Sequence, residues 1–145
     1  MTSLTLVRRI AARPAIVFDA LASPDGIRAW WGPDDGPVLI AESDVRPGGR
    51  FRVRFRRLCG SEHETTGEFL EVRKPERLVM TWRWLGGEDP NESRVEFDLR
   101  AVPEGTEVTF THSGLVDEES RRGHEGGWSG AFDKLVRHFE ITQGK

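Results

Sequence analysis

A histidine near the end of the last predicted strand is the residue best suited to chemistry. His112 alternates with Val108 and Phe110, so strand parity places it on the same face as these two apolar side chains. An imidazole on an apolar face can hydrogen-bond a ligand or exchange a proton with it near neutral pH. His112 is therefore the candidate catalytic residue, although a histidine hydrogen-bonded within the core is the more frequent arrangement.

Two short motifs suggest hydrolase or metal chemistry, and both are incomplete. The segment 127–130, GWSG, resembles a serine elbow, but Ala131 stands where the final glycine is needed and the serine falls in a helical pattern. His63 and Glu64 lack the second histidine of a zinc helix motif, and the single cysteine, Cys59, cannot form a cysteine cluster. The sequence predicts no serine triad, no metal site and no cofactor.

The remaining histidines and two glutamates are weaker candidates. His63, His124 and His138 are expected at the surface or in loops. Glu68 and Glu71 fall on opposite faces of one predicted strand, so one of them points inward unless a bulge intervenes. An inward carboxylate with little solvation would have a raised pKa, which is typical of functional sites.

Arginines alternate with apolar residues through the segment 50–56, RFRVRFR, and Arg57 follows. Such a row could bind an anion or a nucleic acid, or it could form a solvated sheet face paired with Glu96, Asp98 or Glu107 on other strands. The chain has 21 Lys and Arg residues against 24 Asp and Glu residues, a formal net charge of −3. This acidic balance favours the ion-paired face and predicts no nucleic-acid partner.

The elements that must position these residues form an α+β pattern. Alternating apolar residues predict an antiparallel sheet of six to seven strands, and a stripe that includes Trp128, Phe132, Leu135 and Phe139 predicts a long C-terminal helix. Two short helices, each with a proline in the first turn, follow the first strand. The expected strands begin with 4–10 and continue from residue 38 to residue 112.

The bulk composition fits one folded domain over residues 1–145. One cysteine excludes an intrachain disulfide, and no segment approaches the ~20 apolar residues that span a bilayer. The N-terminus lacks a signal-peptide pattern. We therefore expect a cytoplasmic protein without a membrane span.

One terminal helix of ~20 residues, about 30 Å long, can cross a curved sheet but cannot fill its whole concave side. The chain has five tryptophans and eight phenylalanines, which either plug the remaining space or line a pocket. Trp30 and Trp31 end the second short helix near the expected mouth, where they could gate entry or anchor the helix. The predicted ligand-contacting set is Trp30, Trp31, Phe51, Val53, Phe55, Met80, Trp82, Trp84, Phe97, Phe110, His112, Trp128 and Phe132.

Several stretches together resemble a known family. They are ARPAIVFDAL at 12–21, IRAWWGP at 27–33, RPGGRF at 46–51, GEFLEV at 67–72, PERLVMTW at 75–82 and the Gly-Trp pair at 127–128. In order and over nearly the whole chain, they resemble bacterial homologues of the C-terminal domain of the heat-shock protein 90 ATPase activator. That family lies in the START and Bet v 1-like helix-grip superfamily, SRPBCC.

The resemblance implies a ligand-binding scaffold and transfers no catalytic residue. The leading prediction is binding of a small hydrophobic or amphipathic molecule in an internal cavity, for sensing, sequestration or a stress response. One alternative is a cavity enzyme of the cyclase, hydratase or hydrolase type that uses His112. The other is a co-chaperone-like module with a chaperone partner, although the chain leaves no room for the activator's separate N-terminal domain. A homodimer through a sheet edge is compatible with the sequence.

Overall fold

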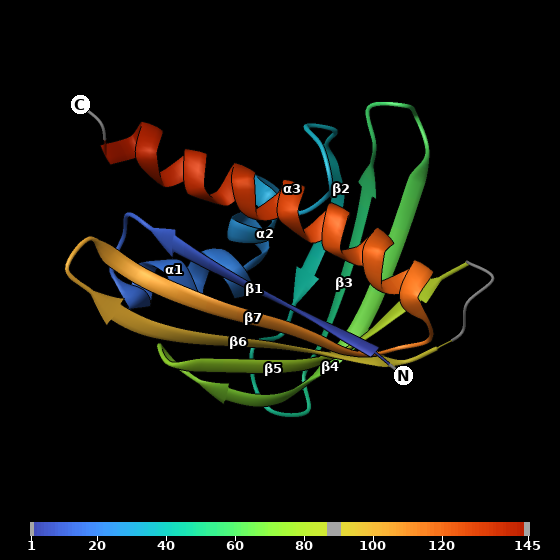
Figure 1. The fold of residues 1–145 in the computed structure, drawn as a ribbon, viewed down its shortest axis with the longest axis horizontal. Coiled ribbons are helices and arrows are strands. Elements are labelled where there is room, and N and C mark those ends of the chain that lie inside the picture. Colours follow the sequence, from blue (N-terminus) through green and yellow to red (C-terminus); the bar gives the residue numbers. More distant parts are fainter. Residues whose placement is uncertain (1, 87–90, 144–145) are drawn as a thin grey trace.

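The computed structural model describes residues 2–86 and 91–143, with side chains described as far as residue 140. It contains three helices and a seven-stranded antiparallel sheet with strand order β1-β7-β6-β5-β4-β3-β2. The elements are β1 (Thr2–Ile10), α1 (Pro14–Ala22), α2 (Pro24–Trp30), β2 (Val38–Ser43), β3 (Arg50–Arg56), β4 (Glu62–Arg73), β5 (Arg77–Leu85), β6 (Ser93–Val102), β7 (Gly105–Leu115) and α3 (Glu118–Gln143). Figure 1 shows α3, in orange to red, crossing one side of the curved sheet. The α+β helix-grip architecture is confirmed.

Local sequence explains how the short helices begin. Pro14 and Pro24 occupy first-turn positions, where the missing N–H costs no helical hydrogen bond. Ser23 caps α2, because its hydroxyl accepts a hydrogen bond from the N–H of Gly26 at 3.0 Å. The helices therefore meet at one residue, and their apolar faces turn into the core that the strands share.

The outer face of the sheet is charged and ion-paired, as expected, but the partners of the arginine row differ from those predicted. Glu64 pairs with both Arg52 and Arg54, and Glu62 pairs with Arg54 at 2.6 Å and with Arg56 at 3.0 Å. Both glutamates lie on β4, directly beside β3. The prediction of Glu96, Asp98 and Glu107 as partners is wrong, because these residues lie on β6 and β7, several strands from β3.

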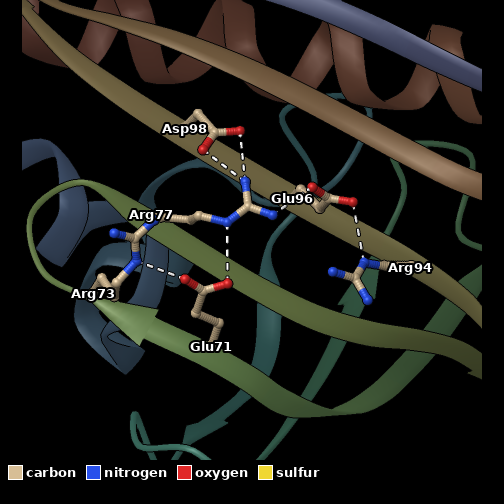
Figure 2. Close-up of polar contacts among 6 residues, drawn as sticks. All are labelled: Glu71, Arg73, Arg77, Arg94, Glu96 and Asp98. Carbon is tan, nitrogen blue, oxygen red and sulfur yellow. Dashed lines mark hydrogen bonds and ion pairs between the residues drawn. The ribbon is translucent and has the colours of Figure 1, made fainter.

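A second cluster on the same face centres on Arg77 (Figure 2). Its guanidinium contacts Glu71 at 3.2 Å, Glu96 at 2.8 Å and Asp98 at 2.7 Å, which ties β4, β5 and β6 together. Arg73 and Arg94 extend the cluster through Glu71 and Glu96. These ion pairs account for the outward acidic residues of the central strands.

The register of β4 shows which face of the sheet carries Glu68 and Glu71. A shift between Phe69 and Glu71 in the pairing with β5 marks a bulge. The bulge returns Glu71 to the outer face, where it meets Arg77, while Phe69 stays buried and Val72 packs against the core. Glu68 lies one residue before Phe69, on the face opposite that ring. Neither carboxylate therefore points inward.

Candidate functional site

A pocket of about 660 Å³ lies where the N-terminal half of α3 passes over β3, β4 and β5 beside the loop that follows α2. Its volume is in the range typical of small-molecule sites. Exposed residues such as Arg57, Arg122 and Gly126 form part of its lining, so it opens to solvent. Its walls are the residues Trp31, Gly32, Pro33, Phe55, Arg57, His63, Trp82, Trp84, Ser120, Arg122, Gly123, His124, Gly126, Gly127, Trp128 and Ala131.

The structure divides the predicted ligand-contacting set into two groups. Five members line the pocket: Trp31, Phe55, Trp82, Trp84 and Trp128. The other eight are buried in the core away from this lining: Trp30, Phe51, Val53, Met80, Phe97, Phe110, His112 and Phe132. Strand parity found the inward face correctly, but it carries no information about which part of that face the helices cover.

Aromatic rings fill the middle of the concave side. Trp128 lies 4.5 Å from Phe110 and 4.9 Å from Trp82 between ring centroids, and Phe97 lies 5.2 Å from Phe110. These separations are those of packed aromatic pairs. The unfilled space therefore lies at one end of the sheet and not beneath the whole length of α3.

His112 is buried and fully hydrogen-bonded. Its Nδ1 accepts from the indole N–H of Trp128 at 3.0 Å, and its Nε2 lies 2.7 Å from the hydroxyl of Ser93. Because Nδ1 is an acceptor, the neutral ring carries its proton on Nε2 and donates it to Ser93. Burial, and secondarily the nearby His124, lower the pKa of His112 to about 3. Both ring nitrogens are therefore engaged in positioning Trp128 and β6.

Two histidines expected at the surface or in loops lie instead in the pocket wall, so that prediction is wrong for them. His63 is on β4, with its ring 5.6 Å from that of Phe55. His124 is on α3, where its Nδ1 lies 2.8 Å from the carbonyl oxygen of Ser120 and its Nε2 accepts from the indole N–H of Trp84 at 3.0 Å. His124 precedes Trp128 by four residues, a spacing that places both side chains on one helix face, and this was the signal available in the sequence. His138 is exposed on α3, as predicted.

The two tryptophans at the end of α2 have different roles. Trp30 is completely buried, and its indole N–H donates to the carbonyl of Ala20 at 2.9 Å, so it anchors α2 on α1. Trp31 is also buried, but it lines the pocket and its ring lies 5.3 Å from that of Trp82. The anchoring interpretation therefore holds for Trp30.

A half-buried lysine, Lys134, holds the loop after α2, which forms part of the pocket wall. The Nζ of Lys134 donates to the carbonyl oxygens of Trp31 at 2.9 Å and Asp34 at 2.6 Å. Burial lowers the pKa of Lys134, and the carboxylates of Asp35 and Asp34 partly oppose that shift. The lysine thus fixes the ends of the segment that presents Trp31 and Pro33 to the pocket.

The glycines of α3 differ in their surroundings: Gly130 packs closely against Pro33, whereas Gly123 and Gly126 face open space. A Cβ on Gly130 would lie 2.2 Å from the carbonyl oxygen of Pro33, so a glycine is needed for this close approach. A Cβ on Gly123 or Gly126 would meet nothing within 4 Å, because these residues face open space at the pocket. The helix already begins at Glu118, so the glycines do not mark a late start.

Metal ligands do not gather at this site. Over residues 2–86 and 91–143, no three His, Cys, Asp or Glu side chains come close enough to hold a metal ion. The same part of the chain has no helix long and apolar enough to cross a bilayer.

Fold and pocket define a helix-grip domain with an aromatic-walled opening at one end of its sheet. The model of the family described as activator of Hsp90 ATPase homolog 1-like protein matches residues 11–140, and the chain belongs to that family. No functionally curated protein matches the sequence.

Solved bacterial structures share the fold over nearly their full length. A protein from Chromobacterium violaceum is 24% identical, with a TM-score of 0.87, and the match covers 95% of this chain and 96% of that one. The AHSA1 protein of Silicibacter pomeroyi is 25% identical with a TM-score of 0.87, covering 98% and 100%. An AHSA1-like protein from Aeromonas hydrophila, solved in solution, is 24% identical with a TM-score of 0.79, covering 97% and 94%.

Proposed function

We propose that this protein binds a small, largely aromatic molecule in the pocket between α3, the central strands and the loop after α2. The observation that carries the proposal is a solvent-connected space of about 660 Å³ walled by Trp31, Phe55, Trp82, Trp84 and Trp128. Trp84 is half-exposed, and the other four rings keep only a small exposed area. A guest that removes this apolar surface from water gains roughly 25 cal/mol per Å².

The pocket also suits reversible binding, because its walls are held independently of any guest. Lys134 secures the loop, His112 orients Trp128, and His124 orients Trp84. A largely pre-formed site is typical of small-molecule binding and reduces the ordering cost of association. Sequestration, sensing or delivery in the cytoplasm are the roles we propose for such binding.

A fluorescence titration with N-phenyl-1-naphthylamine, a neutral aromatic probe, tests the proposal. We expect saturable binding at one site and a raised melting temperature. Gly126→Phe, which places a ring in the open space of the pocket, should abolish both effects. Asp133→Phe adds the same ring at an exposed position of α3 outside the pocket and should bind as the wild type does. Equal binding by the two variants, or no saturable binding by the wild type, would refute the proposal.

The enzymatic alternative receives less support from the geometry. His112, its candidate residue, has both nitrogens bonded within the core and is absent from the pocket lining. A general base must reach the proton that it removes. Turnover by His112 and a chaperone partner stay predictions from the sequence and the family.

A further inference from the structure

Two exposed arginines stand in the wall of the pocket, and they come from different elements. Arg57 directly follows β3, and Arg122 lies in the second turn of α3. Among the lining residues that the structure describes, these two are the charged ones, and none carries a carboxylate. The pocket wall therefore has a positive charge, although the chain as a whole has a formal net charge of −3.

Arg57 ends the arginine row, and it is there that the ion pairing of the row stops. The arginines at 52, 54 and 56 all pair with glutamates of β4. The carboxylate of Asp34 lies near enough to feel the charge of Arg57, but it accepts from the backbone N–H groups of Gly36 at 2.9 Å and Leu58 at 3.1 Å. Arg57 forms no ion pair with any residue that the structure describes, so its N–H donors remain available at the pocket.

Arg122 keeps its charge available because its neighbour takes up the nearby carboxylates. The guanidinium of Arg121 contacts Glu118 at 2.6 Å and Glu125 at 2.8 Å. Arg122 lies 3.9 Å from Glu118, and on exposed side chains a contact of that length contributes little. Arg121 thus neutralises the acidic side of this helical turn, and the charge of Arg122 remains for a guest in the pocket.

The pocket has a separate place for the apolar body of a guest. A Cβ on Gly123 or Gly126 would meet nothing within 4 Å, so the helix side leaves room for a flat molecule. Trp82 and Trp84, with ring centroids 5.4 Å apart, and Phe55 form the sheet side. A charged group beside exposed arginines keeps much of its hydration and avoids the desolvation penalty of a buried charge.

We propose that the pocket selects amphipathic aromatic anions, whose ring system lies between the glycines of α3 and the tryptophans of the sheet while an oxyanion group pairs with Arg57 and Arg122. This inference rests on the proposed function and specifies the chemical class of its ligand. A planar guanidinium matches the two oxygens of a carboxylate or sulfonate with parallel N–H donors. The positive wall also attracts such an anion before contact.

A matched pair of competitors tests the charge preference on the wild-type protein. The compounds 2-naphthoate and 2-naphthamide share one ring system, and only the first is charged. Each is titrated against bound N-phenyl-1-naphthylamine. Because exposed ion pairs are individually weak, we expect the naphthoate to bind about five- to tenfold more tightly at about 0.02 M salt. This preference should fall below about twofold at about 0.5 M salt, since salt screens the charge.

The outcomes separate this inference from the proposed function. A naphthoate that binds no more tightly than the amide overturns the inference, while binding of N-phenyl-1-naphthylamine leaves the proposed function standing. If that probe itself does not bind, both are overturned. A preference that does not change with salt would contradict pairing with the exposed arginines. These measurements need no variant, so they hold even where a substitution impairs folding.

Substitutions then locate the charge. Arg57→Gln and Arg122→Gln each remove one positive charge from an exposed position, so each should reduce the preference for naphthoate about two- to threefold and leave the affinity for naphthamide unchanged. Arg83→Gln is the matched control, because it removes the same charge from an exposed position on β5 outside the pocket lining, and it should keep the full preference. An undiminished preference in the Arg57→Gln/Arg122→Gln double variant, or an equal loss in Arg83→Gln, would overturn the assignment.

Discussion

Trp128 donates its indole hydrogen to the Nδ1 of His112 over 3.0 Å, and this bond joins the pocket wall to the core. It fixes the tautomer of His112, whose Nε2–H donates to the hydroxyl oxygen of Ser93 with 2.7 Å between the nitrogen and the oxygen. A proton added to Nδ1 would remove the acceptor that Trp128 uses and would place a charge in an apolar interior. The bond thus makes the folded state selective for neutral His112.

The first prediction concerns the pH dependence of stability. The pKa of His112 is about 3 in the folded protein against an ordinary 6.5, so between these values the unfolded chain binds a proton that the folded chain does not. This stabilising contribution is complete above pH 6.5 and is lost as the pH falls toward 3, at about 1.4 kcal/mol per pH unit. Urea unfolding should show a loss of about 2 kcal/mol between pH 7 and pH 5.

Two histidine substitutions provide the controls for that measurement. His112→Gln keeps polar atoms in the core but cannot titrate, so its free energy of unfolding should change little over the same interval. His63→Gln removes a half-buried histidine of the pocket wall and should retain the full slope. A slope that survives in His112→Gln would show that another group controls the acid response.

The fold could be predicted from the sequence to a large extent, because periodicity depends on which face of an element is buried. The alternation of Phe51, Val53 and Phe55 with arginines predicted β3, and all three apolar side chains are buried. The ion-pair partners could not be predicted in the same way. Pairing of Arg54 with Glu62 depends on the register between neighbouring strands, which alternation alone does not specify.

The second prediction compares two glycines of α3. Gly130→Ala should destabilise the protein by about 1–3 kcal/mol, since its Cβ would lie 2.2 Å from the carbonyl oxygen of Pro33 and the loop must shift. Gly123→Ala has open space and should stabilise by about 0.5–1 kcal/mol through reduced backbone entropy in the unfolded chain. Urea midpoints measure both, and similar midpoints for the two variants would contradict the close contact with Pro33.

The third prediction concerns the ion-pair cluster of Figure 2. Arg77→Met leaves Glu71, Glu96 and Asp98 without their shared guanidinium and should cost about 1–2 kcal/mol at pH 7, a value reduced for partial solvent screening. Arg94→Met breaks one half-exposed pair and should change stability by less than about 0.5 kcal/mol.

Acid titration gives that prediction a second readout. Burial acts to raise the pKa of Glu96, but the hydrogen bonds from Arg77 and Arg94 outweigh it and hold that pKa below its ordinary value. The stability this provides is present above the ordinary carboxyl pKa and is lost as the pH falls through the folded-state value. The gap between wild type and Arg77→Met should therefore narrow in acid, and a gap that is constant with pH would indicate a packing effect.

The site was harder to predict than the fold, because it depends on what covers the sheet. Trp82 and Phe97 both face inward on adjacent strands, at different points along them, since Trp82 pairs with Ser93 and Phe97 with Leu78. Trp82 lines the pocket, whereas Phe97 is enclosed by core rings. The difference comes from where α2 and α3 cross the strands, which no local pattern in the sequence specifies. The wall residues Pro33 and His63 were missed for the same reason.

The last prediction concerns the lysine that holds the pocket loop. Lys134→Met keeps the length of the side chain but leaves the carbonyl oxygens of Trp31 and Asp34 without their donor, which should cost about 1–3 kcal/mol of stability. Because that loop presents Trp31 and Pro33, affinity for N-phenyl-1-naphthylamine should fall several-fold as well. Arg137→Met lies one turn later and breaks an exposed contact with Asp35 at 3.5 Å, so it should leave both stability and affinity nearly unchanged. If Lys134→Met loses stability but binds the probe as tightly as the wild type, the loop does not need the lysine to complete the pocket.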